Sequence, residues 1–480
     1  MAIKSVQITI LSNGLGAVPP GGGETIAVVG VSQSGTVGTD VQSSNPQDFA
    51  DEFGYGPGPQ AAGFIAQEGG NQVIFTKATT SAVGTNSAVT HTGTGSSVVT
   101  LSGTPIDTYY AILTVITGGT VGTNGCVIAV SLDAGRTTYV TAALVTANTY
   151  AIGNTGLTVN FGAGTLVAGD TYTWTSLEPT ADSTSIVAAL EALRTSGKQF
   201  KNALVVGATD ASAAAAYQTE ANVFFNKKKF TRFFCNARDV LWGGTSTETE
   251  STWVTSITTD FASTSADRLS VGAGFYNMIS PFTQTQYRRP ISWAAAAIDS
   301  SAAIGVDISA VSLGAMPMVA KPANDDGFVY YDAQENSALD SARFLTAQLI
   351  SGLQGWYMTN SNMMAPVGSD FSILPYCEVI DEASRVAYLF FTQYLGGSVR
   401  VSATTGFILD ADANDIDSRC TAQLVADLGT GVSSIRCVVT RNNNILSTKT
   451  LIATVQIVPL GYINTINVTM TFINPALVAV

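Results

Sequence analysis

Residues 25–77 read TIAVVGVSQSGTVGTDVQSSNPQDFADEFGYGPGPQAAGFIAQEGGNQVIFTK, and this stretch decides the fold. Its first seven residues form a short apolar run, typical of a buried strand. Asn45 and the proline after it predict the start of a helix near Gln47–Phe53, because Asn caps helices and Pro suits their first position. A second helix is expected near Gln60–Gln67, before a strand at Val73–Phe75. This β-α-β order predicts an α/β layer.

The composition changes between residues 83 and 178. This region has almost no charges and no helical period, only short Val, Ile, Thr and Tyr runs separated by Gly, Asn and Asp, which is typical of an all-β sandwich. Helical and strand patterns then alternate again, including a helix at Ala211–Asn226 that begins at Asp210. We therefore expect a discontinuous α/β domain of residues 24–82 and 179–365, with the β-sandwich of residues 83–178 inserted on its outer side.

Both ends of the chain carry an apolar alternation. Val6, Ile8 and Ile10 alternate with polar residues and precede a Gly/Pro-rich linker, so residues 1–23 are predicted to form a tethered strand arm. The apolar members of the last predicted strand, Ile463–Phe472, are Ile466, Val468, Met470 and Phe472.

Residues 366–480 are predicted to form a C-terminal domain. The expected elements of the last third are helices near Leu339–Ile350, from Cys377 or Glu378 to about Tyr394 and after Asp410, and strands at Ile435–Thr440, Leu451–Val458 and Ile463–Phe472. The fold class is thus a multidomain mixture of α/β and α+β elements.

The charge balance limits the partners. The chain has 22 basic and 35 acidic side chains, a formal net charge of −13, and only 12% charged residues. Phosphate binding needs a positive surface, so direct DNA contact is not expected. No apolar run reaches the roughly 18 residues of a membrane span. Residues 1–11 lack the basic start and apolar core of a signal peptide, so synthesis in the cytoplasm is expected.

The cysteines and the histidine exclude several kinds of site. The five cysteines are Cys126, Cys235, Cys377, Cys420 and Cys437, and no two lie close enough in sequence for a zinc motif. They are either buried thiols or, in a mature particle outside the reducing cytosol, disulfides between subunits, with Cys420 and Cys437 the best placed. His91 lies in a Gly/Thr-rich stretch without neighbours to tune it, so we expect a surface histidine and no catalytic triad.

Four short motifs are candidate sites. Residues 30–35 follow a strand but lack the glycine order of a nucleotide loop, and Asp410–Asn414 copies only the first half of a calcium loop, so a capped helix start is the simpler interpretation. The acidic cluster of Asp325, Asp326, Asp332 and Glu335 is a candidate for binding a cation or an opposing basic patch, and an exposed hairpin or loop is the alternative interpretation. Arg288 and Arg289 either pair with an acidic neighbour or form an ordinary helix entry. No catalytic residue, metal ligand or cofactor is predicted, so we expect no enzyme.

Two segments resemble contractile tail sheath proteins of bacteriophages. The first is Phe49–Pro57, followed by an Ala-rich helix and Gly69–Lys77; the second runs from Val367–Phe371 to Val379–Tyr388. Glu378, just before the latter, departs from the family pattern. The inserted β block also looks like the outward domains that many sheaths carry.

The resemblance implies a structural subunit of a virion. Sheath subunits stack as hexameric rings around a tail tube, exchange terminal strands and contract to drive the tube through the host envelope. Partners would be further copies, the tube, the baseplate and the tail terminator, with the C-terminal domain facing an acidic tube through Arg385, Arg400 and Arg419. The rival hypotheses are a β-rich surface or adhesin protein and a nucleotide-dependent enzyme.

Overall fold

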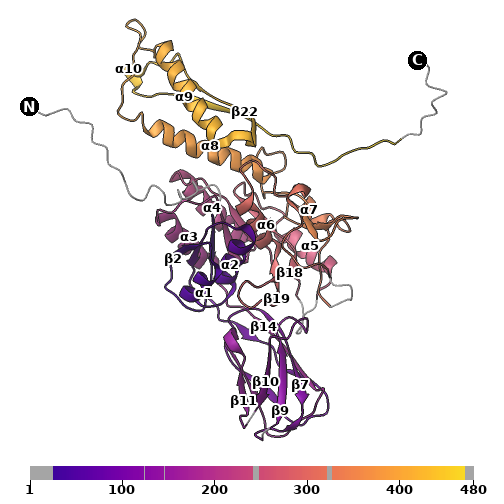
Figure 1. Cartoon of the computed structure of the whole chain (residues 1–480). Coiled ribbons are helices and arrows are strands. Elements are labelled where there is room, and N and C mark those ends of the chain that lie inside the picture. The colour runs from indigo at the N-terminus through magenta and orange to yellow at the C-terminus, as the bar shows by residue number, and fades with distance from the viewer. Residues whose placement is uncertain (1–24, 124, 145, 242–247, 322–326, 471–480) are drawn as a thin grey trace, which may run out of the picture. The chain divides into compact units, whose positions relative to one another are not determined.

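The computed structural model describes residues 25–470 apart from residues 124, 145, 242–247 and 322–326 (Figure 1). The described chain forms two compact units, which meet in sequence at Gly397 and Ser398. None of the helices in this part of the chain is long and apolar enough to cross a membrane.

A six-stranded sheet forms the centre of the first unit. The strand order is β17-β16-β15-β1-β3-β2. All neighbours are parallel except the edge pair of β2 and β3. The strands are β1 (Ile26–Gly30), β2 (Asp40–Ser43), β3 (Val73–Lys77), β15 (Asn202–Ala208), β16 (Phe233–Asn236) and β17 (Leu269–Gly272).

Helices cover both faces of this sheet. One face carries α1 (Pro46–Phe53), α2 (Pro57–Gly69) and α6 (Ile291–Ser301), and the other carries α3 (Ser183–Thr195), α4 (Ala211–Asn226) and α5 (Glu250–Asp260). Alternate strand residues feed the two cores: Val28 packs with the first set and Val29 with the second. The predicted α/β layer is therefore doubly wound.

The predicted helix starts are confirmed. Asn45 accepts a hydrogen bond from the Gln47 amide at 3.3 Å, and Asp210 accepts one from Ala213 at 2.7 Å. Each bond satisfies an amide that the first helical turn leaves without a partner. Helix α4 has the bounds that the sequence predicts.

The inserted segment folds into β structure with a hydrophobic core of its own. Its main sheet has the order β10-β9-β7-β14-β4, with β5 also paired to β14, beside a sheet β11-β12-β6 and the pair β13-β8 (Figure 1, purple). The strands are β4 (Thr85–Asn86), β5 (Thr90–Thr92), β6 (Val99–Gly103), β7 (Tyr109–Thr117), β8 (Gly119–Thr120), β9 (Cys126–Ser131), β10 (Val140–Leu144), β11 (Thr149–Ala151), β12 (Leu157–Phe161), β13 (Thr165–Leu166) and β14 (Thr171–Leu177).

The remainder of the first unit contains two hairpins and two helices. They are β18 (Phe275–Ile279) with β19 (Gln286–Pro290), β20 (Ala347–Leu349) with β21 (Trp356–Met358), α7 (Ala338–Ser341) and α8 (Leu374–Thr392). The sequence places helix α8 in the C-terminal domain, but it belongs to the first compact unit.

The helix predicted near Leu339–Ile350 is wrong. Helix α7 ends at Ser341, and Arg343 then adopts φ 73°. The Leu345 amide donates to the Val271 carbonyl at 2.9 Å, so the apolar run extends the sheet edge at β17 instead of a helix. Tertiary pairing overrides the local pattern here.

The second unit is a helix on a hairpin. Helix α9 (Asp410–Leu428) packs on β22 (Val432–Val439), which pairs antiparallel with β23 (Ala453–Pro459); α10 (Ile445–Thr448) lies between the two strands in sequence. The first two predicted C-terminal strands are confirmed. Ile463–Met470, the described part of the third, lies in no strand, because a strand needs a partner and the described chain supplies none there.

Candidate functional site

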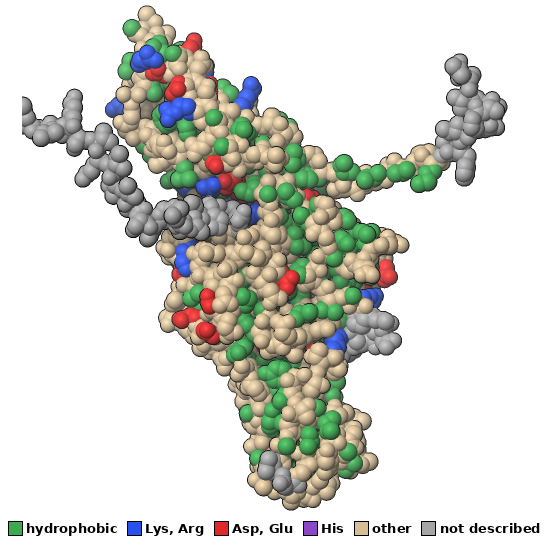
Figure 2. Space-filling view, viewed as in Figure 1, with side chains coloured by type: hydrophobic (Ala, Val, Ile, Leu, Met, Phe, Trp, Pro, Cys, Tyr) green, Lys and Arg blue, Asp and Glu red, His purple; other side chains and the backbone are tan. Residues whose placement is uncertain are grey.

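Several of the few charged side chains are buried. Figure 2 shows how thinly charge is scattered over the visible face, while five cations among the described residues are at least nine-tenths buried. They are Lys201, Arg232, Arg268, Arg288 and Arg289. A buried cation lowers the stability of the fold unless anions and hydrogen bonds satisfy it. The partners of these cations therefore identify the polar contacts that hold separate elements together.

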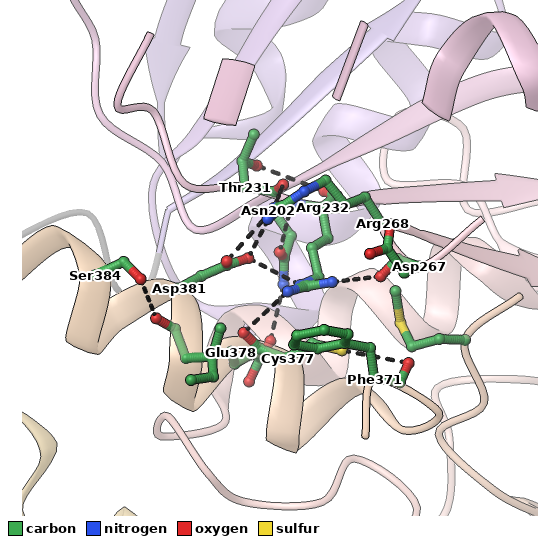
Figure 3. Close-up of polar contacts among 12 residues, drawn as sticks. Asn202, Thr231, Arg232, Asp267, Arg268, Phe371, Cys377, Glu378, Asp381 and Ser384 are labelled. Carbon is green, nitrogen blue, oxygen red and sulfur yellow. Dashed lines mark hydrogen bonds and ion pairs between the residues drawn. The ribbon is translucent and has the colours of Figure 1, made fainter. Parts of the chain in front are cut away.

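The first network, which we call the α8 anchor, joins helix α8 to the sheet and to α6. Lys201 Nζ lies 2.7 Å from Asp299 Oδ1 and 3.2 Å from Glu378 Oε1. Asn202 Nδ2 donates to Asp299 Oδ2 at 2.8 Å. It also donates to Glu378 Oε1 at 2.8 Å (Figure 3). One amide and one ammonium group thus hold two carboxyl groups from different helices.

In the α8 anchor, the surroundings favour a single proton shared by the two carboxyl groups of Asp299 and Glu378. Burial, followed by the neighbouring Asp299 carboxylate, raises the pKa of Glu378 well above its usual range. Burial alone would lower the pKa of Lys201, but Asp299 and Glu378 raise it. The two carboxyl groups therefore favour the charged form of Lys201, and burial beside Asp299 favours the neutral form of Glu378.

A second pair of α8 contacts lies one helical turn further on. Asp381 Oδ2 is 2.8 Å from Arg232 Nε and 3.4 Å from Arg268 Nη1 (Figure 3). Arg232 also donates to the Cys377 carbonyl at 3.4 Å. Positions three apart share one helix face, so Glu378 and Asp381 present their carboxyl groups to the sheet together.

The second network, the insert anchor, fastens the β-sandwich to the α/β layer. Arg289 Nη2 lies 2.7 Å from Asp107 Oδ2 and donates to Gln60 Oε1 at 2.8 Å, while Gln60 Nε2 donates to Asp107 Oδ2 at 2.6 Å. Glu178 Oε2 is 3.9 Å from Arg289 Nη1. Burial and the Asp107 carboxylate raise the pKa of Glu178 to about 7.

Arg288 supports the same junction. It lies 2.6 Å from Asp239 Oδ2 and its guanidinium is 5.2 Å from the Phe328 ring, whose other neighbours include Tyr110 and Arg136 of the insert. Both interpretations of the pair Arg288 and Arg289 hold, because the side chains pair with carboxylates and α6 begins directly after Pro290. The inserted domain is therefore docked through buried contacts and is not merely tethered.

The loop after β1 is unsuited to phosphate. Two amides at its centre are already used: Gln33 donates to the Tyr55 carbonyl at 3.0 Å and Ser34 to the Phe53 carbonyl at 2.9 Å. A phosphate cradle needs free amides that converge on the ligand. The nucleotide hypothesis loses its main candidate.

His91 is exposed, as expected of a surface histidine, but in space it has the acidic and aromatic neighbours that its own stretch of sequence lacks. Its Nε2 lies 3.2 Å from Asp170 Oδ2, and its ring stacks on Tyr172 with centroids 4.4 Å apart. Strand pairing of β5 with β14 brings these residues together, which sequence distance concealed. Asp170 also accepts the Thr94 and Gly95 amides, so the group orders a loop of the insert.

The acidic motifs hold no metal cluster among the described residues. Asp410 begins α9 and Asp412 pairs with Arg400, in line with a helix start. Asp332 accepts the amides of Gln334 and Leu349, whereas Asp325 and Asp326 lie outside the described residues. Across the part of the chain that the structure describes, no three His, Cys, Asp or Glu side chains group as metal ligands.

The three predicted tube-facing arginines each have a carboxylate partner. Arg385 pairs with Glu382, Arg400 with Asp412 at 2.9 Å from Nε to Oδ1, and Arg419 with Asp415 at 3.6 Å. A contact with another protein would therefore have to share or exchange these partners.

The terminal strand candidates are only partly visible. Val6, Ile8, Ile10 and Phe472 lie outside the described residues. Ile466, Val468 and Met470 are 77%, 71% and 90% exposed.

All five cysteines are buried and free. A disulfide between subunits would require a sulfur to reach the surface. Burial therefore disfavours disulfides between subunits. Such disulfides remain a prediction.

Sequence reasoning missed the anchor residues themselves. A signal was present: Arg232 stands inside an apolar strand run, and Asp299 follows an Ala-rich apolar helix segment. A charge embedded in an apolar run is rarely left without a partner.

A protein-family profile described as "DUF2586, N-terminal domain" matches residues 3–362, three quarters of the chain. The chain belongs to the DUF2586 family. A search of curated proteins finds no relative of this DUF2586 protein.

Solved structures resemble this DUF2586 chain over nearly its whole length. The contracted helical sheath of the anti-feeding prophage matches with a TM-score of 0.51 at 10% identity, over 98% of this chain and 99% of the other. A chain of the contracted baseplate of the same prophage matches at 0.50 and 11%, over 98% of each chain. The sheath tail protein of Desulfitobacterium hafniense matches at 0.46 and 11%, over 96% and 100%.

These likenesses concern the fold. The predicted mixed α/β sheath-type fold is confirmed, and so is the resemblance to tail sheath proteins from which it was drawn.

Proposed function

We propose that this DUF2586 protein is a structural subunit of a contractile tail sheath that polymerises around a tail tube and contracts to drive the tube through a host envelope. The observation that carries the proposal is the end-to-end likeness of fold to the contracted sheath of the anti-feeding prophage. The loop after β1, in which the Gln33 and Ser34 amides are already bonded, further favours a mechanical role over nucleotide chemistry.

The chain ends are proposed to join neighbouring subunits. Ile466, Val468 and Met470 form an exposed apolar alternation outside every described sheet of this chain, and Val6, Ile8 and Ile10 repeat the pattern. The β22-β23 sheet has only two strands among the described residues, so its outer edges can accept a further strand. Strand addition would satisfy backbone groups on both sides of the contact.

The other proposed partners, all within a virion, are further copies of the chain in stacked rings, the tail tube, the baseplate and the tail terminator. Residues 366–480 would face the tube, with Arg385, Arg400 and Arg419 as contacts. Because each arginine has its own carboxylate partner, a charge reversal should be compared with the reversal of that partner. Loss of tube co-sedimentation with only the arginine reversals would support the tube contact.

The insert is proposed to form the outer surface of the sheath. Replacing residues 83–178 with a short linker should preserve assembly. The matched variant carries Arg289→Gln as well, because excision removes the Asp107 partner of this arginine.

The decisive experiment is electron microscopy of the full chain, expressed with the tube protein encoded beside it. Striated tubes of stacked rings are expected. Deletion of residues 2–16 should leave folded monomers without tubes, whereas replacement of those residues by a scrambled polar segment of equal length controls for length. Monodisperse particles that never form rings under any ionic condition would contradict the proposal.

A further inference from the structure

The five cysteines are distributed unevenly over the cores of the molecule. Cys126 lies in the core of the insert, Cys235 among the residues under α3, α4 and α5, and Cys377 among those under α1, α2 and α6. Among the described residues, each of these three cysteines is the only one in its cluster. Cys420 and Cys437 both lie in the second unit, on α9 and β22.

The packing of α9 on β22 brings these two thiols together. The Cys437 amide donates to Thr421 Oγ1 at 2.9 Å, and the Val439 amide donates to Asp417 Oδ1 at 2.6 Å. The two acceptors flank Cys420 along the helix. Cys420 is fully buried and Cys437 is 3% exposed, and their side chains hydrogen-bond to each other.

We propose that Cys420 and Cys437 form a disulfide within one chain and so tie helix α9 to strand β22. This differs from the crosslinks between subunits that the odd cysteine count suggests, because the two thiols share the core between α9 and β22, whose backbones are joined by hydrogen bonds on either side of Cys420.

The polarity of the pair supports an order of events. The Cys437 thiol donates its hydrogen bond to the Cys420 sulfur, which lowers the pKa of Cys420, and the same bond raises the pKa of Cys437. In the folded pair Cys420 is therefore the thiol that ionises more readily, and the thiolate is the reactive form.

The oxidant is a low-molecular-weight disulfide such as oxidised glutathione. The Cys420 thiolate attacks one glutathione sulfur, forms a mixed disulfide and releases a glutathione thiolate, which takes up a proton. Cys437 loses its proton, attacks the Cys420 sulfur of the mixed disulfide and releases the second glutathione. The protein loses two electrons and two protons, and one glutathione disulfide becomes two thiols.

The second unit gains from such a crosslink. Its core is small, consisting of Ile408, Ala413, Ile416, Cys420, Leu424, Leu428, Ile435, Cys437 and Val439. Small units gain most from a covalent tie, because it restricts the unfolded chain. Both sulfurs are buried, so oxidation requires local opening of the hairpin or precedes folding.

The test counts free thiols by mass spectrometry. Full-length protein is refolded from denaturant in a buffer of reduced and oxidised glutathione, denatured, and blocked with N-ethylmaleimide. Three blocked cysteines are expected, against five after reduction with dithiothreitol. After tryptic digestion, the crosslink should join CTAQLVADLGTGVSSIR (residues 420–436) to CVVTR (residues 437–441).

Matched variants separate this pair from other thiol chemistry. Cys420→Ala and Cys437→Val should each show four blocked cysteines with or without the oxidant, while Cys126→Ala should keep the crosslink and show two. Oxidised wild-type chain should unfold at a higher denaturant concentration than reduced chain, and the two single variants should lose this difference. Five blocked cysteines in oxidised wild type, a different peptide pair, or a dimer band on a non-reducing gel would overturn the proposal.

Discussion

The inserted β-sandwich and helix α8 are fastened to the same α/β layer by the same chemistry, a buried cation shared between two carboxyl groups. In the α8 anchor the cation is Lys201 and the carboxyl groups belong to Asp299 and Glu378. In the insert anchor they are Arg289, Asp107 and Glu178. The difference lies in the second carboxyl group. The side chain of Glu378 is 3% exposed, whereas that of Glu178 is 26% exposed and 3.9 Å from its cation.

This difference teaches how burial sets the charge state of one motif. Deep burial and the Asp299 charge raise the pKa of Glu378 well above its usual range, which favours an α8 anchor of a cation, an anion and a neutral acid. Burial and the Asp107 charge raise the pKa of Glu178 to about 7, against the opposing effects of Arg289 and the Thr108 hydroxyl, so the insert anchor gains an uncompensated charge as the pH rises through neutrality. The α8 anchor should thus be insensitive to pH near 7, and the insert anchor should respond to it.

The largest effect is expected from removing the cation of the α8 anchor. Lys201→Met leaves two carboxyl groups buried without their ammonium partner, and the free energy of unfolding should fall by about 3–5 kcal/mol. Lys198→Met is the matched control, because the Lys198 side chain is 27% exposed and pairs with Asp40. Denaturant unfolding of the full chain measures both. Equal losses in the two variants would show that the α8 anchor adds nothing beyond an ordinary surface pair.

Removing the anion of the insert anchor should cost less. In Asp107→Asn, Arg289 keeps Gln60 as a hydrogen-bond partner, and Glu178 can replace the lost charge, so we expect a loss of about 2–3 kcal/mol. The same substitution should lower the pKa of Glu178, because the Asp107 charge helps to raise it. Asp51→Asn, on the exposed face of α1, is the control. A loss as large as that of Lys201→Met would mean that Glu178 does not compensate.

Glu178→Gln should stabilise the protein, but only at higher pH. Because the folded pKa is about 7 and the ordinary value is 4.5, the folded chain binds more protons than the unfolded chain between these pH values. Ionisation of Glu178 therefore costs stability increasingly from about pH 4.5 to pH 7, and fully above. The variant should gain about 1–2 kcal/mol at pH 8 and nothing at pH 4.5, after allowance for the partial exposure. Unfolding curves at both pH values, with Glu68→Gln as a surface control, measure the gain. A gain that is equal at both pH values would rule out titration of this group.

Glu378→Gln should change stability least. Because burial favours the neutral acid, a neutral amide of the same shape replaces it with little change in charge, and a change below about 1 kcal/mol is expected at pH 7. Asp381→Asn on the same helix face should cost clearly more, because it removes the charged partner of Arg232. Thermal and denaturant unfolding at pH 7 distinguish them. A large loss in Glu378→Gln would show that Glu378 is ionised, and the contrast between the two anchors would fail.

Local pattern predicted much of the chain correctly. The bounds of α4, the caps at Asn45 and Asp210, and the β texture of residues 83–178 follow from hydrophobic period, capping chemistry and turn residues. These signals act over a few residues and need no distant partner. The same reasoning misassigned Leu339–Ile350, where a contact with β17 overrode the local period.

The partners in the candidate site could hardly be predicted from the sequence, because they are far apart along the chain. Lys201 lies 98 positions from Asp299 in sequence, and Asn202 lies 176 positions from Glu378. His91 and Asp170, 79 positions apart, meet only through strand pairing. A charged residue in an apolar run indicates that a partner exists, but the local sequence does not identify which residue the partner is.

The sequence by itself determined the order of elements in the α/β layer, the inserted β block, the sparse charge and the apolar alternation near the C-terminus, because each depends on neighbours along the chain. Only the tertiary structure decided which charges meet, that α8 belongs with the first unit, that the insert is docked through buried ion pairs, and that Cys420 lies against Cys437. Burial and dielectric surroundings depend on every element packed around a group, and those elements come together only in the folded chain.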